Sequence, residues 1–251
     1  MRFLPVLLAA GCGRIGFTST ELSPGDGPTP DGASEQQPLQ QGCNLTHPGA
    51  LLCDGFEAVD VAWDYQIEDF GSVIRSEARG AQGTASLKIS IETVDEYKYA
   101  RWGKNAVLDF LDSGELHLRE YIFMPSSTVV TDQLSIMVTG NQVDPFPSAN
   151  VLLTPGEIHA VVEGTNAIAP FELPRDRWVC VELHLQISGS DGAIALEIDG
   201  STIVSAQSID TRVGGGYSNI DVGFHYATPA QPASEMFVDE IVAATSPIGC
   251  D

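Results

Sequence analysis

Basic residues are scarce in this chain. It has 12 Lys and Arg against 34 Asp and Glu, which gives a formal net charge of -22 at pH 7. Nucleic acid and anionic membrane surfaces repel a protein of this charge, so we expect neither as a direct partner. Seven of the basic residues fall between positions 75 and 119, where an anionic ligand is therefore expected: Arg75, Arg79, Lys88, Lys98, Arg101, Lys104 and Arg119.

The chain also lacks long apolar runs and helical periodicity. No segment beyond the N-terminus approaches the roughly 20 apolar residues of a membrane-spanning helix. Short alternating or apolar runs are instead bounded by Gly, Pro, Asp, Asn and Ser, a pattern that predicts an all-β protein with two packed antiparallel sheets. These runs are ALLCDGFE, SVIRSE, SLKISIE, ELHLREYIFM, QLSIMVTG, EIHAVVE, WVCVELHLQI, AIALEID, STIVSA, NIDVGFHY and MFVDEIVAA.

One turn can be predicted with its geometry. Asp199 and Gly200 separate the runs AIALEI and STIVSA, and Asp-Gly readily adopts the positive φ angles of a tight two-residue turn. We therefore expect residues 193–206 to form a β-hairpin.

The N-terminus has the parts of an export signal. In MRFLPVLLAAGC one basic residue precedes an apolar run, and small residues stand before Cys12. The ending LAAGC resembles the lipobox of bacterial lipoproteins, although Leu8 stands one position earlier than in the usual pattern. The resemblance implies that residues 1–11 are a signal peptide and that Cys12 carries a lipid. A plain signal peptide or a wrongly assigned start codon is the alternative.

The composition after the signal predicts a tether and one domain. Residues 12–42 are dominated by Ser, Thr, Pro, Gly, Asp and Gln, which favours a flexible tether over a packed structure. Residues 43–251 are numerous enough for one well-buried domain. We expect an exported protein at the outer membrane or cell surface, with the lipid as its only membrane contact.

The other cysteines are even in number. Cys43, Cys53, Cys180 and Cys250 predict two disulfides in an exported chain. The preferred connectivity joins Cys43 to Cys53 and Cys180 to Cys250, and the alternative joins Cys43 to Cys250 and Cys53 to Cys180. A zinc site is the rival use of four cysteines, but the chain has no CxxC pair.

The stretch DRWVCVELHL has two different faces. Apolar residues occupy every second position and predict a strand with one face in the core: Val179, Val181, Leu183 and Leu185. The other face carries Trp178, Cys180, Glu182 and His184. An indole stacks on a sugar ring while a carboxylate and an imidazole bind its hydroxyls, so Trp178, Glu182 and His184 predict a sugar groove. Alternatively, Trp178 covers an edge of the sandwich, Cys180 is disulfide-bonded, and the other two are solvated.

The order of parts over residues 49–244 resembles a known fold. A Trp-led strand, a short loop and a strand ending in Asp-Gly, as in RWVCVELHLQISGSDGAIALEIDGSTIV, resemble concanavalin A-like lectin and glucanase domains, including their laminin G-like branch. CDGFE and FVDEIVAA resemble the first and last strands of these jelly rolls, which lie side by side. The resemblance implies a two-sheet antiparallel jelly-roll sandwich with a concave face on which sugars bind.

Two further segments combine aromatic and basic side chains. In ELHLREYIF, the alternating His117, Arg119 and Tyr121 supply the base, cation and phenol used in uronate chemistry. In DEYKYARWGK, Tyr97 and Trp102 are interleaved with basic residues and suit stacking on an acidic sugar. The alternative for the first is a strand face in water, and for the second, aromatic packing at a strand edge.

Three short segments resemble the alginate lyases of polysaccharide lyase family 7. RSEAR, with Arg75 and Arg79, is similar to the family's R-S-E-L-R strand. EIH, with His159, is similar to its Q-I-H, and FHYATPAQ places Tyr226 in the order of its final tyrosine motif. The resemblance implies that the arginines bind substrate, that His159 assists and that Tyr226 is the acid or base. Each of the first two motifs departs by one residue, and the Lys and Gly of the third are absent.

Calcium is the one metal that the jelly-roll resemblance implies. Asp54, Glu57 and Asp239 fall on the two strands expected to be neighbours, where such modules hold a structural calcium. Carboxylates and backbone carbonyls are suitable hard ligands for this ion. The alternative is that these acids are merely exposed, and no other cofactor is required.

We therefore interpret the chain as a lipid-anchored, extracytoplasmic carbohydrate-binding or adhesion domain without catalytic activity. Its partner would be a polysaccharide or a cell-surface glycan. The alternative is a polysaccharide lyase that cleaves an acidic glycan by β-elimination, and a purely structural surface protein is a third interpretation. The E-x-D-x-x-E signature of the related glucanases is absent, which argues against a retaining glucanase.

Overall fold

The computed structural model describes residues 49–57, 63–141, 148–162 and 164–250. These residues form fifteen β-strands, and within them no helix is long and apolar enough to cross a membrane. The expected signal peptide, Cys12, the expected tether and Cys43 lie outside the described residues.

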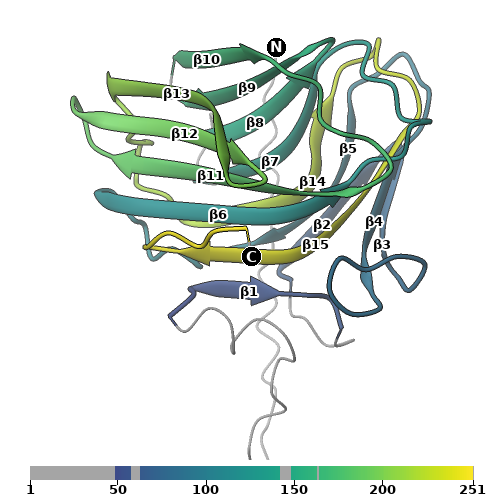
Figure 1. Ribbon diagram of the computed structural model, residues 1–251, viewed down its shortest axis with the longest axis horizontal. Helices are drawn as coiled ribbons and strands as arrows, with labels where there is room; N and C mark the ends of the chain where they lie inside the picture. Colours follow the sequence, from purple (N-terminus) through teal and green to yellow (C-terminus); the bar gives the residue numbers. More distant parts are fainter. Residues whose placement is uncertain (1–48, 58–62, 142–147, 163, 251) are drawn as a thin grey trace, which may run out of the picture. The chain divides into compact units, whose positions relative to one another are not determined.

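One sheet has eight strands. Its order is β13-β12-β11-β6-β15-β4-β3, and β1 pairs with the remaining length of β15 (Figure 1). The strands are β1 (Leu52–Asp54), β3 (Gly71–Ser76), β4 (Ser86–Ile91), β6 (Gly114–Phe123), β11 (Trp178–Ile187), β12 (Gly192–Ile198), β13 (Ser201–Ile209) and β15 (Ser234–Ala244).

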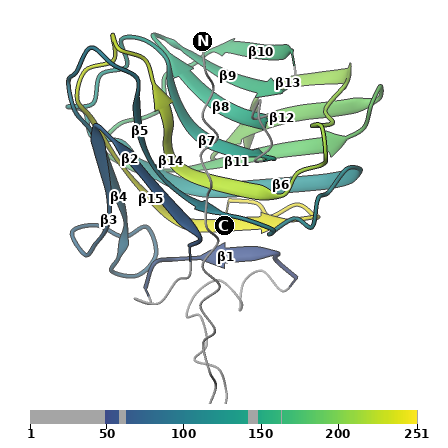
Figure 2. The same ribbon diagram turned by 180° about the vertical axis from the view of Figure 1, so that it is seen from behind.

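The other sheet has seven strands in the order β10-β9-β8-β7-β14-β5-β2. Figure 2 shows it from the opposite side, with β14 beside β7. The strands are β2 (Tyr65–Asp69), β5 (Lys98–Lys104), β7 (Leu134–Gly140), β8 (Ser148–Thr154), β9 (Glu157–Val162), β10 (Thr165–Pro170) and β14 (Asn219–Ala227).

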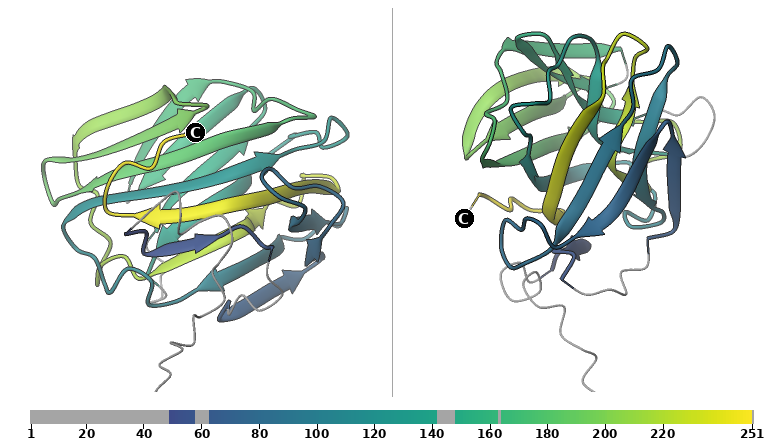
Figure 3. Two further views of the ribbon diagram at one scale, coloured as in Figure 1. Left: turned by 60° about the horizontal axis from the view of Figure 1, so that its bottom comes forward. Right: turned by 90° about the vertical axis from the view of Figure 1, so that its right-hand side faces the viewer.

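Alternating apolar side chains from the two sheets fill the space between them. On β11 the core positions are those expected: Val179, Val181, Leu183 and Leu185. On β14 they are Ile220, Val222 and Phe224, which face the opposite sheet. The two layers are visible in both views of Figure 3. The predicted fold class, an all-β sandwich of two antiparallel sheets, is confirmed.

Two specific expectations about pairing are also confirmed. The first and last strands lie side by side, with Cys53 opposite Val242. Asp199 and Gly200 adopt positive φ angles of 49° and 73° and join β12 to β13 as a hairpin. The strands β2, β5, β8 and β10 were not among the predicted runs.

The core contains one unexpected acid. Glu120 lies on the same face of β6 as Leu118 and Ile122, which is the core face, and it is fully buried. Among the described residues, neither of its carboxylate oxygens has a hydrogen-bond partner. Burial raises the pKa of Glu120 well above its ordinary value, so folding favours the uncharged form of this side chain.

Candidate functional site

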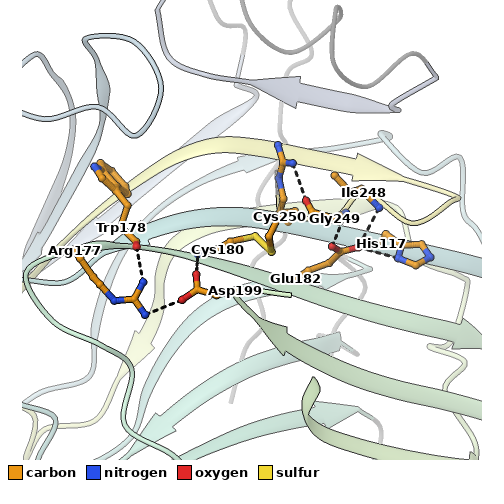
Figure 4. Close-up of a disulfide and its surroundings, with 10 residues drawn as sticks. His117, Arg177, Trp178, Cys180, Glu182, Asp199, Ile248, Gly249 and Cys250 are labelled. Carbon is orange, nitrogen blue, oxygen red and sulfur yellow. Dashed lines mark hydrogen bonds and ion pairs between the residues drawn. A yellow bond between two sulfur atoms is a disulfide. The ribbon is translucent and has the colours of Figure 1, made fainter. Parts of the chain in front are cut away.

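The C-terminal residues 248–250 are held against the outer face of the eight-stranded sheet. Glu182 on β11 accepts hydrogen bonds from the backbone N–H groups of Ile248 and Gly249, at 3.2 and 2.9 Å (Figure 4). Arg119 Nη1 on β6 donates to the carbonyl oxygen of Gly249 at 3.0 Å. Glu182 and Arg119 are only 4% and 2% exposed. We call residues 248–250 with these partners the C-terminal clamp.

A disulfide closes the C-terminal clamp. Cys250 is bonded to Cys180 on β11, as in the preferred connectivity (Figure 4). Cys53 is also disulfide-bonded, and its expected partner, Cys43, lies outside the described residues. This part of the chain therefore uses Cys180 for structure, as the alternative interpretation of DRWVCVELHL stated.

The expected sugar groove beside β11 needs a correction. Glu182 and Arg119 are buried rather than exposed, because residues 248 and 249 are hydrogen-bonded to them, and His117 beside Glu182 is buried as well. Burial acts to raise the pKa of Glu182, but hydrogen bonds from His117 and from the clamp amides lower it below its ordinary value. Glu182 is therefore an ionised acceptor inside the structure. The roles of His184 and Tyr121 in ligand binding remain predictions.

Trp178 belongs to an aromatic group on the same outer face. Its ring meets Phe123 edge-on, with 5.7 Å between the ring centroids. Arg79 lies over the Phe123 ring at 3.7 Å from its centroid. Trp178 is partly exposed, so its predicted contact with a glycan stays open to test.

The four residues carried over from the lyase resemblance do not share one site. Arg75 lies on β3 of the eight-stranded sheet and donates to the carbonyl oxygen of Phe56 at 2.7 Å, while Arg79 lies in the loop after β3. His159 and Tyr226 lie on β9 and β14 of the other sheet. The segment RSEAR leads out of β3, which pairs with β4, and this topology separates the arginines from the other two residues.

A polar cluster occupies the outer face of the seven-stranded sheet. Asp221 and His225 alternate with the core residues of β14, while β5 contributes Arg101 and β2 contributes Tyr65. The Tyr65 hydroxyl donates to Asp221 Oδ1, and Arg101 Nη1 lies 3.3 Å from Asp221 Oδ2. The Tyr65 ring lies over Gly103, where any Cβ would collide with it. We call Tyr65, Arg101, Asp221 and His225 the β14 cluster.

His225 lies between a carboxylate and a guanidinium. Its Nδ1 is 3.1 Å from Asp221 Oδ2. Arg101 Nη1 contacts both ring nitrogens, Nδ1 and, at 2.9 Å, Nε2. Burial lowers the pKa of His225, and the Arg101 charge adds to this while Asp221 opposes it. This environment therefore favours the neutral imidazole.

Tyrosines border the β14 cluster. Arg101 Cζ is 6.0 Å from the ring centroid of Tyr99, and the His225 ring is 6.3 Å from that of Tyr226. Tyr97 is 54% exposed and lies close enough to Tyr226 to raise its pKa, an effect to which burial contributes most. Aromatic rings and one guanidinium thus share a surface, which suits stacking on sugar rings.

Other residues of DEYKYARWGK face inward. Trp102 is partly buried and packs edge-on against Phe56, with 6.4 Å between ring centroids, as in the alternative of aromatic packing, and its contact with a sugar stays a prediction. Lys98 is fully buried and donates to three backbone carbonyl oxygens. Alternation along β5 is the reason, because it turns these two residues inward and Arg101 outward.

His159 lies on the same outer face as the β14 cluster but some distance away. It contacts Asn166 Oδ1 at 3.1 Å and Thr154 Oγ1 at 3.0 Å. β8 and β7 stand between its strand and β14, a separation of roughly 14 Å at about 4.8 Å per strand. His159 and the β14 cluster are therefore far enough apart to contact different units of one extended chain.

The carboxylates expected to bind calcium are occupied by backbone N–H groups. Asp54 accepts from Phe56 at 2.8 Å, Glu57 accepts from Ala85 at 2.9 Å, and Asp239 accepts from Ala81 at 2.7 Å. Burial raises the pKa of Asp54 to about 6 and that of Asp239 to about 7. Calcium at this place stays a prediction.

Asp239 is expected to make the protein less stable as the pH rises. Its pKa of about 7 in the folded chain exceeds the ordinary 3.8, so folding favours the protonated form. The loss of stability therefore grows as the pH rises from the ordinary pKa of 3.8 to the folded pKa of about 7, and it is constant at higher pH. Asp239→Asn removes this pH dependence. The free energy of unfolding of the variant minus that of the wild type should therefore increase by about 3 kcal/mol between about pH 5 and about pH 8.

Urea unfolding of both proteins at several pH values, in the presence of a chelator, measures this difference. Titrating groups that do not interact with Asp239 contribute equally in both chains and cancel, so only the neighbouring Glu240 contributes to the difference as well. A difference that stays constant over this pH range would show that Asp239 titrates normally.

The comparisons with known proteins support the fold. No protein-family model and no curated protein matches the chain. Among solved structures, an endo-β-1,4-glucuronan lyase from the fungus Trichoderma reesei is 14% identical, with a TM-score of 0.63, and the match covers 78% of this chain and 96% of that one. Cellulose induced protein Cip1 is 14% identical, with a TM-score of 0.61 and coverage of 80% and 100%.

A third match is the alginate lyase vAL-1 from Chlorella virus. It is 11% identical, with a TM-score of 0.53, and the match covers 72% of this chain and 92% of that one. At these identities the likeness concerns the fold, which is the jelly-roll sandwich that the sequence resemblance implied.

Proposed function

We propose that this chain binds a polysaccharide on the outer face of its seven-stranded sheet. The observation that carries the proposal is the β14 cluster, which contains Arg101 and Tyr65 and is bordered by Tyr99 and Tyr226. Phenol rings stack on sugar rings, and a guanidinium binds hydroxyls or a carboxylate. Two of the similar structures are lyases of glucuronan and of alginate, which agrees with a glycan ligand.

The net negative charge of the chain affects how an acidic glycan could bind at Arg101. A chain with a net charge of -22 repels an acidic glycan at long range, but salt screens this repulsion beyond about 8 Å. Binding of an acidic glycan then depends on contacts with Arg101 itself.

Polysaccharide cleavage by β-elimination is the second candidate function. The neutral form of His225 is favoured, its Nδ1 lies beside Asp221, and Arg101 contacts both of its ring nitrogens. If a uronate carboxylate took the place of the imidazole on Arg101, Nε2 could accept the C5 proton while the C4–O bond breaks and a C4=C5 double bond forms. Tyr226, next to His225, could donate a proton to the departing oxygen.

The proposal also includes export and a lipid anchor on Cys12. The order of parts in MRFLPVLLAAGC supports it, as does the Cys180–Cys250 disulfide, because such bonds persist in oxidising compartments. The sequence offers no other apolar segment for membrane attachment.

The test measures retention of the mature chain on alginate, glucuronan, pectate and cellulose. Arg101→Gln is expected to weaken retention of an acidic glycan by about 10- to 100-fold, since a hydrogen bond to a charged group contributes roughly 1.5–3 kcal/mol. The matched control is Arg79→Gln, which removes an arginine from the loop after β3, where it packs over Phe123 of the other sheet, and should leave retention unchanged. If Arg79→Gln weakened retention and Arg101→Gln did not, the ligand would bind at Arg79 of the segment RSEAR instead. If the wild-type chain were retained on none of the glycans, the proposal would be rejected.

The same mixtures separate binding from cleavage. Ultraviolet absorbance of the unsaturated product should rise only if the chain is a lyase, and His225→Gln should then abolish turnover while retention persists. Retention without any rise in absorbance supports a binding protein.

A further inference from the structure

Two histidines and a carboxylate meet on the outer face of the eight-stranded sheet. His117 on β6 is the cross-strand partner of His184 on β11, and their rings stack with centroids 4.2 Å apart. Glu115, two residues before His117 on the same face of β6, brings its Oε2 to 3.5 Å from His117 Nε2. One potential ligand atom from each of the three residues lies within 4.8 Å of the other two.

The hydrogen bonding of His117 leaves one nitrogen free to bind an ion. Its Nδ1 is 3.1 Å from Glu182 Oε1, and a carboxylate only accepts, so Nδ1 carries the hydrogen. A metal ion can then bind through the lone pair that Nε2 bears in this tautomer. His117 is 3% exposed, and within the described residues Nε2 of both His117 and His184 is buried without a hydrogen-bond partner. Buried polar atoms without partners are rare and call for an explanation.

We propose that Glu115, His117 and His184 bind a first-row transition-metal ion of the Zn²⁺ class. Two imidazole nitrogens and a carboxylate oxygen are a common ligand set for such ions, with water in the fourth position. Two ligand atoms that each lie about 2.1 Å from a tetrahedral zinc ion are about 3.4 Å apart. The distance between Glu115 Oε2 and His117 Nε2, 3.5 Å, is close to this value. Glu115 is exposed and His184 half-buried, so the ion can enter from solvent.

Glu182 links this site to the C-terminal clamp. One of its oxygens faces His117 Nδ1, and the carboxylate also accepts the amides of Ile248 and Gly249. A carboxylate that orients a ligand histidine in this way raises the basicity of the ring and fixes its tautomer. Glu182 is therefore a positioning residue for the ion, and the proposed glycan face on the other sheet is not involved.

The experiment is calorimetric titration of the mature, tag-free chain with zinc chloride after treatment with a chelator. We expect one ion per chain. His184→Gln should weaken the affinity by more than the roughly 10- to 100-fold that loss of an outer hydrogen bond costs. His184 is the ligand to replace because it is less buried than His117, so its variant is more easily kept folded.

A charge-matched pair of variants completes the test. Glu115→Gln should weaken zinc binding, whereas Glu197→Gln removes the same charge from the neighbouring strand β12 and should leave the affinity within a few-fold of wild type. Zinc should also shift the ring proton resonances of two of the five histidines, and these shifts should vanish in His184→Gln. Absence of binding to wild type, or equal affinity in wild type and His184→Gln, would overturn the proposal.

Discussion

Replacing Val181 with Asp is expected to unfold the protein. Val181 is fully buried on β11, with Ile198 on one neighbouring strand and Glu120 on the other. Glu120 is already a buried acid without a hydrogen-bond partner among the described residues, so Asp would place a second carboxyl beside it. An uncompensated buried polar group can cost more than about 4 kcal/mol, and folded domains have only about 5–15 kcal/mol of stability. Circular dichroism and urea titration would show the loss of a cooperative transition.

Gln186→Asp is the matched control, because it introduces the same residue on the outer face of the same strand. Gln186 is exposed, so we expect a cost below about 1 kcal/mol, from the low preference of Asp for strands. A folded Val181→Asp protein as stable as Gln186→Asp would mean that the core face of β11 is assigned wrongly.

Local patterns predicted much of this fold. The alternation in DRWVCVELHL identifies the core face of β11, and Asp199-Gly200 identifies a hairpin, because both signals depend on neighbouring residues. The strand β10 was missed since its sequence, TNAIAP, ends in proline and offers few apolar residues. Glu120 shows the limit of the pattern, for it occupies a core position where a polar residue is expected outside.

The candidate sites depend on pairings that no local pattern encodes. Tyr65, Arg101 and Asp221 come from three strands far apart in sequence, and only the order β14-β5-β2 brings them together. The spacing of Asp221 and His225 opposite core residues in NIDVGFHY was the one available sequence signal. The sequence pattern places Glu182 on the outer face of its strand, where a sugar was expected to bind it. Its hydrogen-bond donors are instead the amides of Ile248 and Gly249, more than sixty residues further along the chain. Sequence alternation shows which face a side chain occupies but not what covers that face.

Removing the Cys180–Cys250 disulfide is expected to lower the free energy of unfolding by about 4 kcal/mol. The bond closes a loop with a sequence separation of 70, and the loss of chain entropy in the unfolded state predicts this magnitude. The double variant Cys180→Ala, Cys250→Ala is preferable to a reducing agent, because reduction would also break the disulfide of Cys53. Urea unfolding of the variant and wild type measures the difference.

Hydrogen exchange at the amides of Ile248 and Gly249 shows whether the folded state changes as well. Both amides donate to Glu182, so they should remain protected if the disulfide acts only on the unfolded chain. Fast exchange in the double variant would show instead that the disulfide is needed to hold the C-terminal clamp on β11. A loss of stability below about 1 kcal/mol would contradict the loop-closure argument, because a bond with a sequence separation of 70 should restrict the unfolded chain strongly.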